Sequence, residues 1–577
     1  MKQCDDDYIY DAVKYGINPD DMWEDLPEEI VDGLDPEQSD LVKKRKAWNR
    51  TAPTSIALPS EIYREVIDRR KRYVDIRTKI ENGEINQIND FITYNLNIRQ
   101  FVQDVIENTN DPDFLRHFYK TINSITILDP TCGSGAFLFA AMNILESLYE
   151  ACIMRMRAFV EDEDRLNEAE KKSFSNKYKF FRDVLAETQS QHHPNLQYFI
   201  FKSIILQNLY GVDIMKEAVE IAKLRLFLKL VATVDADYRK PNLGLEPLPD
   251  IDFNIRAGNT LVGFASEKEL GKNLVEDIMG AIVKKEIEEK CDIVARTFTR
   301  YKKIQLRSGD DYNDFKAAKE ELNKRLKELN HELNLLLHKQ ASGLKYEDWL
   351  ASHQPFHWFS EFYEIIHDKG GFDVIIGNPP YLEVRQINYE PKELKTYASG
   401  AVHNMCIERS LQILRKEGNI SMIVPLAIVC TQRMIAVQNL LENNRTTWYS
   451  NFAWRPAKLF ENVNRALTIF VSNSFTKSEV YTTNYMKWQA ETRDELFPNL
   501  SFTPWSEKRN SFWVPKLGNQ IELTVLRKVL NYDTSISYIL SSNSSNRVYY
   551  RTTGGLYWKI FTDFSPKFFV NHRFSCT

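Results

Sequence analysis

The chain has 577 residues, of which 80 are acidic and 75 are basic, for a net charge of −5. Hydrophobic residues make up 43% of it and aromatic residues 12%, which is enough for a large core and excludes a disordered chain. No apolar run reaches the ~20 residues of a membrane span, and the N-terminus has no apolar signal core. Seven widely spaced cysteines without a CxxC pair argue against a disulfide framework or a zinc knuckle. We therefore expect no membrane segment, no metal and a cytoplasmic location.

The charge is unevenly distributed along the chain. Residues 1–40 contain 14 acidic residues and two lysines, a net charge of −12, so the other 537 residues carry +7. Residues 501–577 contain ten basic and four acidic residues together with 15 aromatic ones. A nucleic-acid partner therefore stays open in spite of the acidic total, because phosphate binding needs a local basic surface and not a basic whole.

Short apolar runs alternate with helical patterns from residue 123 onward. Ahead of them, helical spacing over residues 60–122 predicts a helical N-terminal region, 1–122. Two helices are expected at 137–148 and 218–230. Strands are expected at 125–129, 209–213, 372–378, 419–425, 448–454 and 466–471. Such alternation predicts an α/β fold with a doubly wound, mostly parallel sheet.

Two long stretches interrupt this alternation. The strands that end at Asp129 and Asp213 lie 84 residues apart, whereas a plain strand-helix-strand unit needs about 30. We therefore expect one helical insertion at about 150–200 and a larger one at about 265–365. A seam of leucines in the larger one predicts two antiparallel helices, about 281–307 and 311–340, joined at Ser308-Gly309-Asp310. The seam consists of Leu322, Leu326, Leu329, Leu333 and Leu336. A structural hairpin is the simpler interpretation, and a DNA-contacting arm is the alternative.

A glycine-containing turn joins the first predicted strand to a helix. From Asp129 to Phe137 the sequence reads Asp-Pro-Thr-Cys-Gly-Ser-Gly-Ala-Phe. Gly133 and Gly135 permit a tight turn and the close approach of a ligand, and the helix start presents free N–H groups to an anion. The third glycine of the dinucleotide fingerprint is missing, which disfavours a hydride-transfer cofactor. A purely structural turn is the alternative, and Cys132 is expected to be a small packing residue.

Asp213 ends the next predicted strand. An acidic side chain at this place lies across the crevice from the glycine turn and can accept hydrogen bonds from both hydroxyls of a ribose. An ordinary cap of the following helix is the alternative interpretation.

The motif Asn378-Pro379-Pro380-Tyr381 follows a further apolar strand. Two consecutive prolines donate no hydrogen bonds and hold the backbone extended. The side-chain carbonyl of Asn378 and the backbone carbonyl of Pro379 can each accept one N–H from an exocyclic amine, and Tyr381 can stack on the ring. Two such acceptors would favour a tetrahedral nitrogen whose lone pair points at an electrophilic methyl group. The motif therefore predicts a site for a planar, amino-substituted ring.

The two motifs, in this order, resemble those of the adenine-N6 DNA methyltransferases of the gamma class, which use S-adenosylmethionine. The helical insertions and the stretch 254–263 are similar to the methylase part of type IIG restriction-modification enzymes and of related phage-defence methylases. The resemblance covers roughly residues 90–475. It implies the S-adenosylmethionine-dependent methyltransferase fold, adenine-specific methyl transfer to double-stranded DNA, and a prokaryotic cytoplasm.

The resemblance also implies roles for single residues. The turn that cradles the cofactor is matched by Asp129, Thr131, Cys132, Gly133, Gly135 and Phe137. Asp213 matches the acid that binds the ribose. Asn259 stands where related enzymes place an acid or amide against the cofactor adenine. Thr51-Ala52-Pro53 is a degraded version of the upstream motif that closes over the cofactor.

The target-base site of the family is matched by Asn378, Pro379, Pro380 and Tyr381. Phe460 resembles the aromatic residue that packs on the far face of the flipped adenine, and ordinary core packing is its alternative. A glutamine or RNA-guanine methyltransferase is a rival function, because both use this motif or close variants of it. A non-catalytic DNA-binding or scaffold remnant is a second rival.

We expect the catalytic domain at 123–475 and the start of a DNA-recognition region at 476–577. About 100 residues are short for a complete recognition domain, and no convincing nuclease metal motif is found before residue 125. Two interpretations follow: the chain is a fragment of a longer system, or it is a subunit whose expected partner is a separate recognition or nuclease subunit. The residues expected to contact DNA in this region are Arg547, Tyr549, Tyr550, Arg551, Tyr557, Trp558 and Lys559.

Overall fold

The computed structural model divides the chain into two units, Met1–Gly518 and Asn519–Thr577. It describes residues 6–165, 177–189, 193–234, 239, 249–273, 278–306, 312–339, 343–474, 478–506, 513–532, 549–550 and 561–562. In the second unit it describes helix α20 (Gln520–Leu530) and an antiparallel pair of strands, β10 (Tyr549–Tyr550) and β11 (Phe561–Thr562). The other residues expected to contact DNA near the C-terminus lie outside the described residues.

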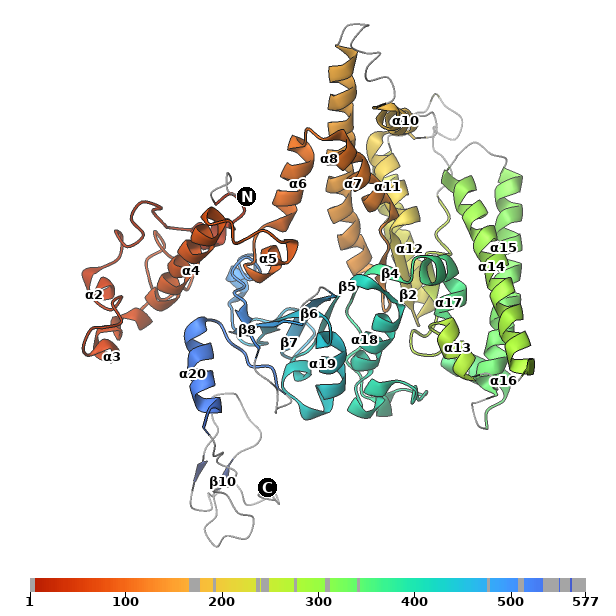
Figure 1. The fold of residues 1–577 in the computed structure, drawn as a ribbon. Helices are drawn as coiled ribbons and strands as arrows, with labels where there is room; N and C mark the ends of the chain where they lie inside the picture. The colour runs from red at the N-terminus through yellow and green to blue at the C-terminus, as the bar shows by residue number, and fades with distance from the viewer. Residues whose placement is uncertain are drawn as a thin grey trace. The chain divides into compact units, whose positions relative to one another are not determined.

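A nine-stranded sheet forms the centre of the first unit within the described residues (Figure 1). Its order is β3 (Ile255–Ala257), β2 (Leu209–Asp213), β1 (Ile127–Asp129), β4 (Phe372–Gly377), β5 (Leu414–Pro425), β7 (Leu467–Asn473), β6 (Thr446–Phe452), β8 (Val480–Met486) and β9 (Thr503–Pro504). Strands β3 to β5 are parallel, and β7 is antiparallel to both of its neighbours. The predicted doubly wound, mostly parallel sheet is therefore confirmed.

Helices α8 (Ala136–Asp164), α11 (Leu196–Gln207) and α12 (Lys216–Val231) pack against β1 and β2. Their shared core contains Leu138, Met142, Ile204, Leu226 and Leu209, all at most 1% exposed. By length and composition α8 could span a membrane, and it is the one such helix among the residues searched. Because its apolar residues build this core, α8 is explained as the long core helix behind the glycine turn. Helices α18 (Val402–Ile413) and α19 (Ile435–Glu442) contact β5 and β6 respectively.

Both expected insertions are helical where they are described. The end of α8, α10 (Lys179–Thr188) and α11 form the first. In the second, α14 (Ile278–Leu306) and α15 (Tyr312–His338) lie side by side (Figure 1). Four leucines of the predicted seam are at most 4% exposed, namely Leu322, Leu326, Leu329 and Leu333, and they pack on Ile287, Cys291 and Val294 of α14. The expected turn at 308–310 lies outside the described residues. The remaining helices here are α13 (Glu267–Asn273), α16 (Tyr346–His353) and α17 (Trp358–Glu361).

The N-terminal region contains only helices among its described elements, as its spacing predicts. They are α1 (Asp11–Lys14), α2 (Glu28–Val31), α3 (Leu41–Lys44), α4 (Tyr63–Glu81), α5 (Ile88–Thr93), α6 (Ile98–Asn108) and α7 (Pro112–Ser124). Hydrogen bonds tie this region to the sheet, from the Trp448 indole to Thr93 Oγ1 (3.1 Å) and from Asn473 to Asn89 (2.9 Å). The short helix η1 (Ala47–Asn49) also lies in this region, and the other short helices are η3 (Glu364–Asp368), η4 (Val384–Gln386), η5 (Lys395–Ser399), η6 (Leu426–Val429), η7 (Gln432–Met434) and η8 (Ala490–Thr492).

The sheet differs from the sequence expectation at its margins. Three strands were not predicted. Strand β3 has three residues, too few to show a period. Strands β8 and β9 continue the sheet beyond residue 475, where we expected the catalytic domain to end. Strand β5 begins at Leu414, five residues before its predicted start. The expected role of the residues after 475 in DNA recognition stays a prediction.

Candidate functional site

The motifs predicted to carry chemistry end neighbouring strands at one edge of the sheet. Strand β1 ends at Asp129, β2 ends at Asp213, and Asn378 follows β4 directly. Strand β1 lies between the other two, and the chain winds outward from it in both directions. This is a topological switch point, where doubly wound sheets open a crevice at the carboxyl ends of their strands. The two motifs are close, since a Cβ on Gly377 would lie 2.9 Å from Asp129 Oδ1.

The glycine turn has the conformation that its sequence predicts. Gly133 and Gly135 have φ angles of +51° and +78°, which favour glycine. A Cβ at Gly135 would lie 3.0 Å from Ala222 of α12, so this glycine permits close packing. A Cβ at Gly133 would meet nothing within 4 Å, so the turn borders open space. Cys132 is buried, and burial raises the pKa of its thiol, which fits a packing residue and not a nucleophile.

Asp213 joins the ends of β1 and β2. Its Oδ2 accepts the backbone N–H of Gly133 (2.8 Å), and its Oδ1 accepts that of Met215 at the start of α12 (2.9 Å). The side chain is partly exposed. A carboxylate has about four lone-pair positions, so two stay free for ribose hydroxyls. The capping and ligand-binding interpretations are thus compatible.

Asp129 lies beneath the turn and is 1% exposed. Its Oδ1 accepts the backbone N–H of Thr131 (3.0 Å). Burial raises the pKa of the Asp129 carboxyl to about 7, the N–H of Thr131 opposes this, and the negative charge of Asp213 adds to it. The hydroxyl of Thr131 is itself buried and has no hydrogen-bond partner among the described residues.

The residues that follow β3 approach the same turn. The Thr260 hydroxyl donates to the backbone carbonyl of Pro130, and the Trp358 indole donates to the carbonyl of Thr260 (3.1 Å). Asn259 is 2% exposed, and its Oδ1 accepts the N–H of Leu261 (3.1 Å). Burial raises the pKa of Tyr389 to about 12, and the Asn259 side chain opposes that rise. Asn259 therefore lies just after β3, next to the residue that contacts the glycine turn, and its role against the cofactor adenine stays a prediction.

In the motif Asn378-Pro379-Pro380-Tyr381, side-chain hydrogen bonds position the polar groups. The Tyr381 hydroxyl lies 2.5 Å from Asn378 Oδ1 and 3.1 Å from the carbonyl of Ile423, so it has two acceptors for one proton. Burial raises the pKa of the Tyr381 phenol. Pro379 is buried and Pro380 is exposed. By donating to Asn378 Oδ1, the Tyr381 hydroxyl can fix the orientation of the Asn378 amide, so that the positions of its oxygen and its N–H₂ are not exchanged.

Phe460 reaches the same cluster as Tyr381. Both rings are partly buried against a group formed by Phe452, Leu459, Leu467, Trp488, Leu496 and Leu500. Phe460 lies in the loop between β6 and β7, so residues far apart in sequence meet here.

Thr51-Ala52-Pro53 is bonded within the N-terminal region, where Ala52 N–H donates to the carbonyl of Glu61 (3.0 Å) and Thr51 bridges to Ile62. Its expected cofactor role stays an untested prediction.

Two further residues surround the motif without any sequence signal. His403, at the start of α18, is 4% exposed and lies edge-on to the Tyr381 ring, with 6.3 Å between ring centroids. Burial, aided by the charges of Arg433 and Arg465, lowers the pKa of His403 to about 4 although Glu383 opposes it, so the imidazole is neutral at pH 7. Arg465 Nη1 donates to the carbonyl of Tyr381 (3.3 Å). A lone histidine in a buried helix of mixed composition and a loop arginine match no pattern, which is why sequence reasoning missed them.

The residues at this edge fit S-adenosylmethionine. Open space borders Gly133, the buried Thr131 hydroxyl lacks a partner among the described residues, and Asp213 has free acceptor positions. Such a donor and acceptor set suits a ligand with a ribose and an amino-acid group. No group of three or more histidine, cysteine or acidic residues that could hold a metal occurs in the part of the chain searched.

Two family models match overlapping parts of the chain. The Eco57I restriction-modification methylase model matches residues 207–460, and the MmeI DNA-methyltransferase domain model matches residues 103–262. Together the two matches span residues 103–460, which resemble the methylase domains of restriction-modification enzymes. This methylase region contains the glycine turn, Asp213, Asn259, the Asn378 motif and Phe460.

A protein of Methanocaldococcus jannaschii, named as an inferred type II restriction enzyme and methyltransferase, is 29% identical over an alignment of 395 residues that covers 60% of this chain. The chain spans 29% of the length of that relative.

Solved structures match with low scores. The type ISP enzyme LlaGI with a DNA substrate mimic has a TM-score of 0.34 at 12% identity, over 89% of this chain and 36% of that one. MmeI in complex with DNA has a TM-score of 0.32 at 10% identity, over 78% and 46%. A modification subunit from Vibrio vulnificus has 0.29 at 11% identity, over 90% and 86%.

Proposed function

We propose that the chain transfers a methyl group from S-adenosylmethionine to the N6 amino group of adenine in DNA, within a restriction-modification or phage-defence system. The observation that carries this proposal is the junction of β1 and β4. There the glycine turn after Asp129 and the Asn378 motif end adjacent parallel strands, with 2.9 Å between a Cβ built on Gly377 and Asp129 Oδ1. A methyl donor in the turn and an amine at Asn378 would therefore be neighbours.

The cofactor supplies an electrophilic methyl group when bound. In this proposal Gly133 leaves room for it, Asp213 accepts its ribose hydroxyls, and the Thr131 hydroxyl and Asn259 offer polar contacts at either side. The near-perpendicular packing of Trp358 and Phe356 behind the 258–260 segment (75° between rings, 4.9 Å between centroids) keeps that segment in place. These residues bind and orient, and none of them takes part in bond making.

The target adenine must leave the duplex to reach this edge, because its amino group is inaccessible inside the stack. Asn378 Oδ1 and the carbonyl of Pro379 would accept the two N–H bonds of its amino group and direct the nitrogen lone pair at the methyl group. Tyr381 and Phe460, both packed on one cluster, would hold the ring between them. Fixed acceptors of this kind need no reorganisation in the transition state, which is where such sites gain most of their rate.

The proposal includes double-stranded DNA as substrate, a separate recognition or nuclease subunit as partner, and a prokaryotic cytoplasm as location. The matched family descriptions, which name DNA methyltransferases and restriction-modification methylases, support the first of these.

Methyl transfer measured with labelled cofactor on unmethylated duplex DNA, ribosomal RNA and a release-factor protein tests the reaction. We expect label in DNA alone, recovered as N6-methyladenine after digestion, at a rate that falls by about a hundredfold or more with Asn378→Ala. Label in RNA or protein instead would identify one of the rival methyltransferases. Cofactor binding by calorimetry without transfer to any acceptor would indicate the non-catalytic remnant.

A further inference from the structure

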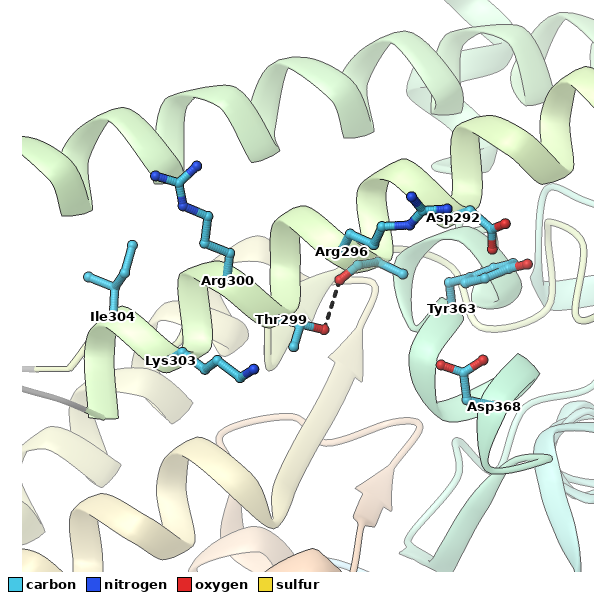
Figure 2. Close-up of a pocket in the computed structure, with 9 residues that line it drawn as sticks. Asp292, Arg296, Thr299, Arg300, Lys303, Ile304, Tyr363 and Asp368 are labelled. Carbon is cyan, nitrogen blue, oxygen red and sulfur yellow. Dashed lines mark hydrogen bonds between the residues drawn. The ribbon is translucent and has the colours of Figure 1, made fainter.

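A cavity of about 610 Å³ lies away from the carboxyl edge of the sheet, between α14 and the segment that leads into β4. It is lined by Asp292, Ala295, Arg296, Thr299, Arg300, Lys303, Ile304, Tyr363 and Asp368. Figure 2 shows the polar residues of α14 following one another along the helix, with Tyr363 and Asp368 on a separate helical segment beside them. Nothing in the proposed reaction uses this cavity.

Three cations line it from one helix face. Arg296, Arg300 and Lys303 stand at positions i, i+4 and i+7 of α14, so they form a row about 10 Å long at 1.5 Å per residue. All three are exposed, and none forms an ion pair within the described part of the chain. We refer to them as the cationic row. The hydroxyl of Thr299, between them, donates to the carbonyl of Ala295 (3.0 Å).

The two acids that line the cavity are engaged elsewhere. Asp292 is hydrogen-bonded to Tyr363, and burial together with that bond raises the pKa of the Tyr363 phenol. Asp368 Oδ1 lies 2.9 Å from Nδ1 of His367. These bonds orient the two carboxyl groups but do not remove their charge, so three basic and two acidic residues line the cavity, an excess of one basic residue.

Other cations of the hairpin show the contrast. Lys284 pairs with Glu288 (3.4 Å) and Lys290 with Glu332 (2.6 Å), while Lys319 lies 2.7 Å from Asp252. Like charges three or four residues apart destabilise a helix, and opposite charges at this spacing stabilise it. The three cations therefore repel one another in the free protein, a repulsion that Asp292, four residues before Arg296, partly offsets. A bound polyanion would replace this repulsion with attraction.

We propose that the cationic row binds the phosphodiester backbone of duplex DNA at a place separate from the target base. The three charges are arrayed along a helix and do not converge on one point, which suits a row of phosphates better than a single anion. Backbone contacts of this kind need exposed charge and no base-specific geometry. The inference rests on the proposed function only in its choice of DNA as the polyanion.

The location of α14 in the fold indicates which measurable property should change when the cationic row is removed. Lys302 Nζ bonds the hydroxyl of Tyr210, the second residue of β2 (2.7 Å), and Gln305 bonds the backbone of Asp250 ahead of β3. The cationic row is therefore associated with the amino ends of the strands, whereas Asn378 follows a carboxyl end. We expect it to affect DNA affinity and its salt dependence, and to leave turnover at saturating DNA unchanged.

The test compares two triple variants that remove the same charge. Arg296→Gln, Arg300→Gln and Lys303→Gln remove the cationic row, and Lys284→Gln, Lys285→Gln and Lys316→Gln remove three lysines of the same hairpin that pair with acids. Binding of the cofactor-free chain to a random duplex of about 40 base pairs, roughly 130 Å long, is measured by fluorescence anisotropy over a range of salt. Circular dichroism checks that both variants are folded.

We expect the first variant to flatten the slope of log K against log salt by about 2–3, because each phosphate that the protein no longer neutralises lowers the slope by roughly 0.9. The matched variant should change it by less than about 1. Equal slopes for the two variants would overturn the proposal. If a nucleoside triphosphate bound at the row and the duplex slopes were equal, the cavity would be a small-molecule phosphate site and the DNA assignment would be wrong.

Failure of the proposed function has a different signature. Suppose that the natural chain methylates no acceptor but that the slope flattens only in the first variant. DNA binding by the cationic row would then be supported and the proposed reaction would be wrong. If the chain methylates DNA and the two triple variants have equal slopes, the proposed reaction would be supported and DNA binding by the cationic row would be wrong. Asn378→Ala, measured in parallel, should keep the full slope because its amide is proposed to contact only the target base.

Discussion

The carboxyl edge of the sheet and the hairpin of α14 and α15 hold their charged groups in opposite ways. At the edge, Asp129 is 1% exposed and Asp213 accepts two backbone N–H groups at 2.8 and 2.9 Å. On α14, Arg296 and Arg300 are exposed and unpaired within the described residues.

The difference follows from what each region can do. A reacting group needs acceptors that are fixed before the reaction, in a site from which water is largely excluded. Association with a polyanion needs only accessible charge, and the salt around it sets the strength. We therefore expect substitutions at the edge to change chemistry, cofactor affinity or the pH dependence of stability. Substitutions in the cationic row should change DNA affinity and its salt dependence, and leave turnover at saturating DNA unchanged.

The largest effect is expected at Asn378. Asn378→Ala removes one fixed acceptor for the target amine, so turnover should fall by about a hundredfold or more, while cofactor affinity stays nearly unchanged. Single-turnover methylation and calorimetry measure the two quantities. Lost cofactor affinity with turnover retained at saturating cofactor would make Asn378 a cofactor residue.

The next effect is expected at Asp213. Asp213→Ala should weaken S-adenosylmethionine binding by about 1.5–3 kcal/mol, because hydrogen bonds to a charged acceptor are removed. It should also destabilise the fold, since the N–H groups of Gly133 and Met215 lose their acceptor. Asp213→Asn is the matched control, because it keeps an acceptor without the charge. Unchanged affinity in both variants would place the ribose site elsewhere.

The burial of Asp129 predicts a dependence of stability on pH. Its pKa is about 7 in the folded chain against an ordinary 3.8, so the folded state binds more protons between these values. The contribution of Asp129 to stability is therefore present below pH 3.8 and is lost as the pH rises to about 7, by up to about 1.4 kcal/mol per unit.

Urea unfolding at several pH values compares the natural chain with Asp129→Asn, which removes the titration and keeps an acceptor for Thr131. The difference in unfolding free energy should shift in favour of the variant as the pH rises. A difference that is flat from pH 4 to 8 would show that Asp129 is ionised throughout.

The smallest effect is expected at the Tyr381 hydroxyl. Tyr381→Phe keeps the ring and removes the bond to Asn378, so the amide is less well oriented and turnover should fall by about threefold to tenfold, the scale of one hydrogen bond. In an Asn378→Asp background the loss should be smaller, because a carboxylate has two equivalent oxygens. A double-mutant cycle measures this coupling. Additive effects would mean that Tyr381 acts through its ring alone.

Much of the fold could be predicted because its signals are local. The predicted strand at 209–213 coincides with β2, and the hairpin helices begin and end within a few residues of their expected bounds. Each has a periodic or apolar pattern long enough to read. Strand β3 has only three residues, Ile-Arg-Ala, without a run of strand-forming types, whereas β8 has such a run and only its pairing with β6 shows that it belongs to this sheet.

For the site, the sequence by itself determined which residues are candidates, since the glycine turn, Asp213 and the Asn378 motif each stand at the end of a pattern that predicts a strand. Only the tertiary structure decided how they meet. The strand order places β1 between β2 and β4, the Tyr381 hydroxyl lies 2.5 Å from Asn378 Oδ1, and His403 is buried beside the ring. The physical reason is that hydrogen bonds, burial and pKa values depend on neighbours brought together from distant parts of the chain, and no local pattern encodes such neighbours.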